Sequence, residues 1–249
     1  MGFVSKEQYD FYWENGYLVI EKFFSHGEAD IFYEGAKKVA TKDFKTLLHL
    51  DREKDLLLQN PDSKEADRKL IANLARWIQF HPRMVGILEE LYLREMAALQ
   101  SIILFKEKGS PYQSTAWNPH QDNAYIKNKN NLYLAVGYPL MDFSPDNGGF
   151  YIYPGSHKED ILPFEFNNAA AQSKVDEKPG NKCEIPSQYK KMDICLNKGD
   201  SLIFHGNLVH GSYANVSDRS RPLVVINYLP YGEDFLPGRT SKRVMTRCH

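Results

Sequence analysis

The sequence has little of what several protein classes require. It holds 3 cysteines in 249 residues, at Cys183, Cys195 and Cys248, and none is close to another in the chain. A disulfide framework, a redox Cys-x-x-Cys pair and a zinc finger are therefore excluded, and we expect a reducing, cytoplasmic location. Because 31 basic and 32 acidic residues give a formal net charge of −1, we expect no nucleic-acid partner. No apolar run approaches the roughly 18 residues of a membrane-spanning helix, and the first residues lack the pattern of a signal peptide.

The first third of the chain shows apolar side chains at helical spacing. Ser25 followed by Glu28 forms the pattern of an N-terminal capping box. The segment Asp43–Lys64 is charged and polar for most of its length and is predicted to be a mobile excursion. Helices are predicted over Lys6–Asn15, from Ser25 through about Val39, over Ala66–Phe80 and from Pro82 to about Tyr92, with a short strand at Tyr17–Phe24.

The last two thirds of the chain predict strands. Six short runs are mostly bounded by Gly, Pro, Asn or Asp: Gln100–Phe105, Leu132–Leu140, Gly149–Tyr153, Lys191–Leu196, Ser201–Phe204 and Pro222–Leu229. With no long helix between them, they favour an antiparallel barrel or sandwich. About thirty residues, Lys158–Ser187, show little periodicity, and we expect this segment to be a lid over the functional site.

The densest functional signal is the run from Trp117 to Asp122. On a strand, His120 and Asp122 would point to the same face, because residues two apart share a side. A third ligand must come from elsewhere, and the run from Phe204 to Ser212 offers His205 and His210. Two histidines and one carboxylate leave three metal positions open, which is the arrangement of non-haem Fe(II) oxygenases. By itself the pattern leaves two alternatives open, a hydrogen-bonded turn and a zinc site that performs hydrolysis.

A cation follows the distal histidine at a useful distance. Arg221 lies eleven residues after His210 and leads into an apolar strand (221 minus 210). A guanidinium matches a carboxylate in a bidentate way and stays charged when buried. Ser212 could add a hydroxyl to the same carboxylate, so a dicarboxylate cosubstrate such as 2-oxoglutarate fits. Arg219 is the rival of Arg221, and the position of Arg221 relative to the strand favours Arg221.

These residues and their order resemble the phytanoyl-CoA dioxygenase family of Fe(II)/2-oxoglutarate-dependent oxygenases. The resemblance covers most of the chain. It begins with a helix, a glycine and a strand over Tyr9–Ile20. It continues through Leu104-Phe105-Lys106, His120-Gln121-Asp122, Gly148-Gly149, Pro154-Gly155-Ser156-His157, Lys198-Gly199-Asp200 and His210-Gly211-Ser212, and it ends at Arg221. Several of these elements are weak alone, but their order is specific.

The resemblance implies one domain over residues 1–249. Its fold would be mainly β with helices: a double-stranded β-helix of the jelly-roll, cupin-like kind. Helical support would span about residues 1–97, the barrel core about 98–230, and the lid 158–187. Fe(II) would be held by the metal ligands His120, Asp122 and His210. The cosubstrate 2-oxoglutarate would be held by Arg221 and Ser212, with Gln100 and Lys106 on the strand before the metal motif also reaching it.

The implied reaction uses O2 and 2-oxoglutarate to hydroxylate an unactivated C–H bond, with release of succinate and CO2. Halogenases related to the family lack the metal-binding carboxylate, so the presence of Asp122 favours hydroxylation. We expect a small polar substrate, because no basic cluster suits the phosphates of a CoA tail. The alternatives are an acyl-thioester hydroxylase and a non-catalytic cupin-like module that binds a small molecule or a metal.

Several positions carry more specific expectations. Many relatives have an aromatic residue where this chain has Gly137, and Tyr133 or Tyr138 could fill the space. Asn118 and Tyr125 flank the metal motif and either contact substrate or pack at the barrel mouth. His157 is expected to cap backbone groups in a turn. The remaining histidines, His26, His49, His81 and His249, show no partner pattern and are expected at the surface or at helix ends.

Overall fold

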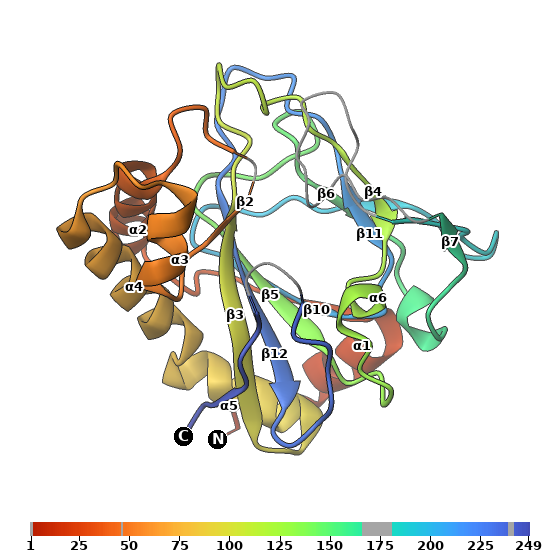
Figure 1. Cartoon of the computed structure of the whole chain (residues 1–249). Coiled ribbons are helices and arrows are strands. Elements are labelled where there is room, and N and C mark those ends of the chain that lie inside the picture. The colour runs from red at the N-terminus through yellow and green to blue at the C-terminus, as the bar shows by residue number, and fades with distance from the viewer. Residues whose placement is uncertain (1, 46, 166–180, 239–241) are drawn as a thin grey trace.

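Two antiparallel sheets face each other, and helices from the first third of the chain cover the outer face of the larger sheet (Figure 1). The computed structural model describes residues 2–45, 47–165, 181–238 and 242–249. This is the double-stranded β-helix with N-terminal helices that the sequence predicted. Within the described residues, no helix is both long and apolar enough to cross a membrane.

The larger sheet, here called the large sheet, has seven strands. Along its path the strands are β1 (Tyr17–Ile20), β10 (Ser201–His205), β5 (Leu134–Pro139), β12 (Leu223–Pro230), β3 (Met96–Leu104) and β13 (Thr246–Arg247), and β2 (Leu47–His49) also pairs with β3. Strand β3 is therefore flanked by β12 on one side and by two short strands on the other. Because β13 comes from the C-terminus and β2 from the helical region, distant parts of the sequence close this edge.

The four-stranded sheet, here called the small sheet, holds β4 (Trp117–His120), β11 (His210–Ser212), β6 (Phe150–Ile152) and β9 (Met192–Asp193). Its strands are two to four residues long, in contrast to the nine residues of β3. A separate pair is formed by β7 (Phe164–Glu165) and β8 (Lys182–Cys183). The predicted lid lies between and around these two strands, but its central residues, 166–180, lie outside the described part of the chain.

The helices are α1 (Lys6–Asn15), α2 (His26–Val39), α3 (Glu53–Gln59), α4 (Glu65–Gln79), α5 (Pro82–Tyr92) and the short α6 (Asn123–Ile126), with a 3-10 turn η1 (Ser156–Lys158). Capping boxes at Ser5 and Ser25 begin α1 and α2. Gly16 ends α1 with a φ of 82°, a left-handed conformation that favours glycine, and turns the chain directly into β1. The capping box predicted at Ser25 is confirmed.

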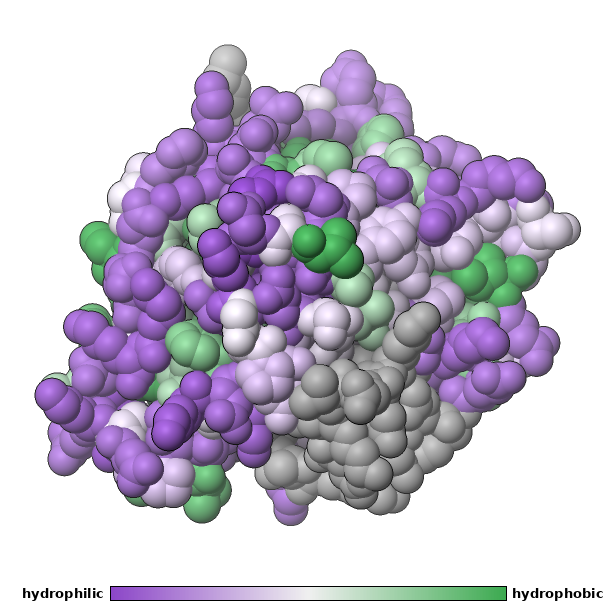
Figure 2. Space-filling model, turned by 90° about the horizontal axis from the view of Figure 1, so that it is seen from above, coloured by the Kyte–Doolittle hydropathy of each residue, from purple (hydrophilic) through white to green (hydrophobic). Residues whose placement is uncertain are grey.

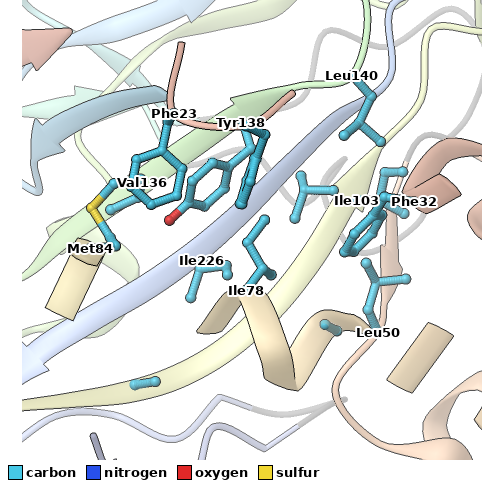
Figure 3. Close-up of a cluster of buried hydrophobic side chains, with 14 of the residues drawn as sticks. Phe23, Phe32, Leu50, Ile78, Met84, Ile103, Val136, Tyr138, Leu140 and Ile226 are labelled. Atoms are coloured by element: carbon cyan, nitrogen blue, oxygen red, sulfur yellow. The ribbon is translucent and has the colours of Figure 1, made fainter. Parts of the chain in front are cut away.

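The main core lies between the helices and the outer face of the large sheet (Figure 3). Ile103, Val136 and Ile226 come from three neighbouring strands, and Ile78 and Met84 come from α4 and α5; all are fully or almost fully buried. Burying one such side chain contributes roughly 1.5–3 kcal/mol, so this layer supplies much of the stabilisation. In contrast, the face of the molecule in Figure 2 is mostly hydrophilic, with apolar side chains in separate small groups.

The segment Asp43–Lys64, predicted to be a mobile excursion, contains two regular elements, β2 and α3. Among its many charged residues the segment has three leucines that pack into the core, each at most 1% exposed: Leu48, Leu50 and Leu56. The support region is also less purely helical than expected, since β1, β2 and the start of β3 all fall before residue 98. Strand β1 ends at Ile20, four residues earlier than predicted.

Candidate active site

The two histidines predicted to bind metal lie directly opposite each other in the small sheet. His120 ends β4 and His210 begins β11, and the antiparallel register pairs these two residues. Side chains of directly opposed residues start about 5 Å apart on the same face of a sheet. The two imidazole rings accordingly have centroids 4.4 Å apart. Asp122 was predicted to lie on the same strand as His120. It instead follows that strand, at the N-terminal cap of α6.

The three side chains form one cluster. Asp122 Oδ1 lies 3.4 Å from His120 Nε2 and 3.9 Å from His210 Nε2. One ligand atom from each residue fits within 4.8 Å of the others, and this is the metal-ligand cluster found among the described residues. Ligand atoms about 2.1 Å from one ion and at right angles would be about 3 Å apart, so the side chains need to move little.

The state of each ligand also suits a divalent ion. Asn118 O lies 2.6 Å from Nδ1 of His120, and Leu208 O lies 3.1 Å from Nδ1 of His210. These carbonyls accept from a protonated Nδ1, which leaves each Nε2 lone pair for a metal. Burial lowers the pKa of His210 to about 4, so this ring is neutral near pH 7. Burial alone would raise the pKa of Asp122. The two histidines outweigh this effect, so the pKa is lowered overall and the carboxylate is ionised. The donor set therefore fits Fe(II).

Close packing around β11 explains the glycine between His210 and Ser212. A Cβ on Gly211 would lie 2.4 Å from the Tyr151 hydroxyl and 2.8 Å from Trp117 O. Both are closer than real Cβ contacts allow, so only glycine fits between these neighbours without a shift. Gly211 thus keeps β11 close to β4 and β6, which holds the His210 ring beside His120.

Arg221 is a buried cation that lines the same pocket as the metal ligands. It is 1% exposed, and its Nε and Nη1 have no hydrogen-bond partner among the described residues. Its guanidinium lies over the Phe143 ring at 5.3 Å, and burial lowers the pKa of Arg221 to about 9. A buried charge without a partner is costly, so the site is suited to an anion. The rival Arg219 points elsewhere, being paired with Asp146 at 2.8 Å.

Ser212 and Lys106 form a unit beside Arg221. Ser212 lines the pocket, and its Oγ accepts from Lys106 Nζ at 2.8 Å, which leaves the hydroxyl proton available to an anion. Lys106 Nζ also donates to the carbonyl oxygens of Gly148 and Tyr213. Burial and then the nearby Arg221 lower the pKa of Lys106 well below its usual range. Lys106 is fully buried and does not line the pocket; it contacts the pocket residue Ser212 instead, and its own role toward the cosubstrate stays a prediction.

The other predicted residues separate into two groups. Gln100 lines the pocket opposite Asn227, with its Oε1 unpartnered among the described residues, and its role toward the cosubstrate stays a prediction. Tyr125 also lines the pocket, and its hydroxyl accepts from the backbone N–H of Asn181 at 2.7 Å. Asn118 does not line the pocket, so the prediction that it contacts substrate is not supported; its carbonyl instead orients the His120 ring.

The position of Gly137 is now explained in part. Tyr133 lines the pocket, whereas Tyr138 lies on the opposite face of β5, where it packs against Phe23 in the main core (Figure 3). Tyr138 therefore does not fill the space left by Gly137, and the prediction that a tyrosine does so is left with Tyr133. A Cβ on Gly137 would meet Leu223 Cδ1 at an ordinary contact distance of 3.5 Å.

His205 and His157 form a pair away from the metal ligands. Their ring centroids are 5.2 Å apart, and His157 Nε2 lies 3.0 Å from the carbonyl oxygen of Trp13. His205 Nδ1 accepts from the backbone N–H of Asn207 at 3.1 Å. Both histidines are buried, and neither lines the pocket. His205 is therefore no rival of His210, and His157 bonds a backbone group as predicted.

Sequence reasoning missed two polar residues of the pocket. His49, expected at the surface, lies on β2 and lines the pocket, and Arg243 reaches it from the C-terminal segment. No local motif marks either residue. The one available signal for His49 was its alternation with Leu47 in an apolar stretch, since both lie on the inner face of β2. Arg243 could not be found, because it is brought to the pocket only by tertiary pairing of the C-terminal segment with β3.

The pocket itself is small and mixed in character. Its volume is about 260 Å³. Its charged lining residues are Asp122, Arg221 and Arg243, and its apolar lining includes Ile102, Leu104, Phe150, Phe204 and Val225. The cavity therefore combines metal ligands, buried cations and apolar surface in one space.

Comparison with known sequences finds phytanoyl-CoA dioxygenases. A profile of the family described as phytanoyl-CoA dioxygenase (PhyH) matches residues 12–223. A peroxisomal phytanoyl-CoA dioxygenase of Bos taurus is 23% identical over 234 residues, covering 90% of this chain and 68% of the relative. A phytanoyl-CoA dioxygenase of Arabidopsis thaliana is 24% identical over 260 residues, covering 88% of this chain and 87% of the relative.

Solved structures show the same fold. The epimerase SnoN, in complex with Fe3+, alpha-ketoglutarate and nogalamycin RO, superimposes with a TM-score of 0.69 at 18% identity, over 96% of this chain and 94% of that one. HygX of Streptomyces hygroscopicus with nickel and 2-oxoglutarate bound gives a TM-score of 0.65 at 17% identity, over 92% and 88% of the two chains. At these identities the structural match supports the fold, and the site must be judged from the residues of this chain.

Proposed function

The chain belongs to the phytanoyl-CoA dioxygenase family and is an Fe(II)- and 2-oxoglutarate-dependent oxygenase, and from this premise we propose that it hydroxylates an unactivated C–H bond of a small, polar organic molecule. The ligands His120, Asp122 and His210 would hold the iron. We also propose that residues 1–249 act as a single oxygenase domain, because the helices share the main core with the barrel strands.

One observation carries the proposal: the unpartnered guanidinium of Arg221 lines the same cavity as the metal ligands. Arg221 would bind the carboxylate of 2-oxoglutarate that is remote from the metal, and the Ser212 hydroxyl would donate to the same group. Lys106 would position Ser212 by holding its oxygen. A dianion that enters this pocket would compensate the buried charge of Arg221, which explains why that charge is tolerated.

When bound, iron with 2-oxoglutarate and O2 supplies an oxidant strong enough for an unactivated C–H bond, with release of succinate and CO2. The residues of the chain contribute positioning. Three protein ligands leave three metal positions for cosubstrate and O2. The apolar side chains Phe150, Phe204 and Val225 line the cavity beside the ligands and would exclude water from the reaction. Asp122, present as a third ligand, favours hydroxylation over halogenation.

The size and charge of the cavity favour a small substrate. A volume of about 260 Å³ lies just below the roughly 300–1,000 Å³ of typical ligand pockets. Arg221 and Arg243 are the cations that line it, and this is too sparse a set for the several phosphates of a CoA tail. These features support a small polar molecule over an acyl-thioester.

The proposed role of Arg221 can be tested without knowing the substrate. Anaerobic titration of the protein with Fe(II) and then 2-oxoglutarate should produce a weak visible charge-transfer band. In Arg221→Gln the affinity for 2-oxoglutarate should fall by at least about 30-fold, while Fe(II) affinity measured by calorimetry stays at the native value. The matched control is Arg219→Gln, an exposed arginine two positions away, which should bind the cosubstrate normally.

Two outcomes would overturn the proposal. Folded protein that binds Fe(II) but gives no band with 2-oxoglutarate would not be this kind of oxygenase. An equal loss in Arg219→Gln and Arg221→Gln would mean that the clamp is wrongly assigned. The reaction type is tested by screening compounds for stimulated succinate formation and weighing the product: hydroxylation adds one oxygen atom, whereas epimerisation, named for the fold relative SnoN, leaves the mass unchanged.

A further inference from the structure

The C-terminal segment brings a second arginine to the pocket. Strand β13 pairs with β3 at Ala97 and Ala98, and the backbone N–H of Val244 donates to Leu99 O at 3.2 Å. Figure 1 shows this segment, in dark blue, running beside β3. Arg243 precedes Val244 and lines the pocket. The segment is thus fixed to the large sheet by backbone hydrogen bonds, next to the position where Arg243 enters the cavity.

Arg243 is held locally but is not neutralised. Its backbone N–H donates to Pro237 O at 2.7 Å and its Nη1 donates to Leu236 O at 3.3 Å. Among the described residues it forms no ion pair within 4.0 Å, although its charge is close enough to help lower the pKa of Asp122, and its Nε is buried without a hydrogen-bond partner. The other arginine of the described residues 242–249, Arg247, pairs with Glu95 at 2.6 Å. Of these two arginines, the one that lines the cavity is therefore the one without a salt bridge.

His49 lies in the same part of the cavity. Gln59 fixes its backbone on both sides, accepting from His49 N at 2.9 Å and donating to His49 O at 3.1 Å. The Nδ1 of His49 is buried and has no partner among the described residues. Burial lowers the pKa of His49 to about 4, and the charge of Arg243 acts in the same direction, which places the two side chains within electrostatic reach. A rigid, neutral imidazole with a spare nitrogen therefore accompanies the cation.

The charges of the pocket do not balance without a further anion. Among its lining residues Asp122 contributes −1 and Arg221 and Arg243 contribute +1 each, giving +1. A divalent ion and dianionic 2-oxoglutarate add +2 and −2, so the loaded pocket would keep +1. Arg221 would be used by the cosubstrate, so the remaining charge is that of Arg243.

The two arginines are too far apart for one cosubstrate. Arg221 exchanges backbone hydrogen bonds with Lys106, two residues past the end of β3, and Val244 bonds to Leu99 on β3, seven positions earlier (106 minus 99). Seven strand residues span roughly 23 Å, and roughly 11 Å would remain if both side chains reached about 6 Å toward each other. The terminal carbons of 2-oxoglutarate are only about 5 Å apart, given bonds of about 1.5 Å.

We propose that Arg243, assisted by His49, binds an anionic group of the primary substrate, a carboxylate or a phosphonate or phosphate, at the end of the pocket away from Arg221. The inference rests on the proposed function, whose substrate class it narrows from small and polar to small and acidic. A guanidinium donates to two oxygens of such a group at once, and the imidazole donates a third hydrogen bond to the same group. The substrate is then oriented with its acidic group at Arg243 and its carbon skeleton along the apolar lining, toward the metal.

The test uses three probes whose lengths differ by at most one carbon: butanoate, butylphosphonate and the uncharged butanamide. Each is titrated by calorimetry into protein loaded with Ni(II) and 2-oxoglutarate, so that binding is measured without turnover. At least one anion should bind with a dissociation constant on the order of 1 mM and about 10-fold more tightly than the amide. The comparison of butanoate with butylphosphonate tells which acid the site prefers.

The variant Arg243→Gln should lose this preference, so that the anion binds no better than butanamide, with 2-oxoglutarate affinity unchanged. Arg243→Lys keeps the charge and should keep part of the preference. The matched control is Lys242→Gln, which removes the neighbouring charge from an exposed side chain outside the pocket and should behave as the native protein. Circular dichroism checks that each variant is folded.

The inference is overturned if neither anion binds the native protein, if the amide binds as well as the anions, or if Arg243→Gln keeps the preference. It is also overturned if Arg243→Gln weakens 2-oxoglutarate instead, because Arg243 would then belong to the cosubstrate site. These failures differ from failure of the proposed function. That failure would appear earlier, as a native protein that forms no charge-transfer band with Fe(II) and 2-oxoglutarate.

Discussion

The two sheets of the barrel contribute differently to the protein. The small sheet provides His120 and His210 from strands of four and three residues, and Asp122 lies two residues after His120. The large sheet has long strands whose outer face packs on the helices, and Arg221 lines the pocket just before β12 begins. The main core and the metal ligands therefore lie in different layers, although a second apolar cluster joins the two sheets. The pocket lies where these layers meet.

The largest effect is expected from removing a ligand on the small sheet. Asp122→Ala should lower Fe(II) affinity by more than the roughly 100-fold that losing an outer-shell partner costs, and succinate formation should disappear. Stability in urea should change little. Asp193→Ala, an exposed acid on β9 of the same sheet, is the control and should bind iron normally. If Asp122→Ala binds iron within a few-fold of native, the small sheet is not the metal layer.

The converse substitution removes a core side chain of the large sheet and leaves the metal ligands in place. Ile226 is fully buried against the helices, so Ile226→Ala should cost about 3 kcal/mol of unfolding free energy. Folded Ile226→Ala should still bind Fe(II) with native affinity, as measured by calorimetry below the unfolding transition. Val216→Ala, at a side chain 80% exposed, should stay within about 0.5 kcal/mol. A tenfold loss of iron affinity in Ile226→Ala would show that the two layers are coupled.

His205 tests the junction, because β10 of the large sheet leads through it toward β11 of the small sheet. Burial lowers the pKa of His205 to about 3. The unfolded chain takes up a proton below pH ~6.5 and the folded protein does not until about pH 3, so stability is lost as the pH falls through this window. From pH 7.5 to pH 5, urea unfolding of His205→Gln should lose on the order of 2 kcal/mol less than native. Equal losses would mean that His205 is not held neutral.

The smallest effect is expected at Gly137, in the centre of the large sheet. Because its backbone has no positive φ and a Cβ would meet Leu223 at an ordinary 3.5 Å, Gly137→Ala should fit. Stability should change by less than about 1 kcal/mol, toward stabilisation, since glycine weakens a strand interior. Urea unfolding and 2-oxoglutarate titration measure both possible effects. A tenfold loss of cosubstrate affinity would show that the pocket needs this space.

Local patterns predicted the parts of the fold and site that are set by local physics. The capping box at Ser25 and the metal motif at His120 are short-range features, and both were found in the sequence. The pairing of His210 with His120 depends on register between strands 90 positions apart (210 minus 120), so resemblance to a family was needed to choose it over His205.

The features that the sequence did not predict depend on long-range pairing. The strand and helix in segment Asp43–Lys64 were not predicted because β2 forms its hydrogen bonds with β3, 53 to 57 residues later (102 minus 49 and 104 minus 47), and not with a neighbouring segment. Lys106 was predicted to reach the cosubstrate, but its three acceptors come from segments far along the chain, and they hold its ammonium outside the pocket lining. Arg243 belongs to the same class, since its position follows from β13.

The edge of β3 that pairs with both β2 and β13 has a further consequence, for self-association. A strand edge with free N–H and C=O groups is a template for a strand of another molecule. In this protein β2 covers the edge at Ile102–Leu104 and β13 covers it at Ala97–Ala98. A protease that removed the last few residues would leave the apolar residues of β3 open to intermolecular pairing. The same C-terminal strand that places a cation in the pocket therefore also protects the protein against aggregation.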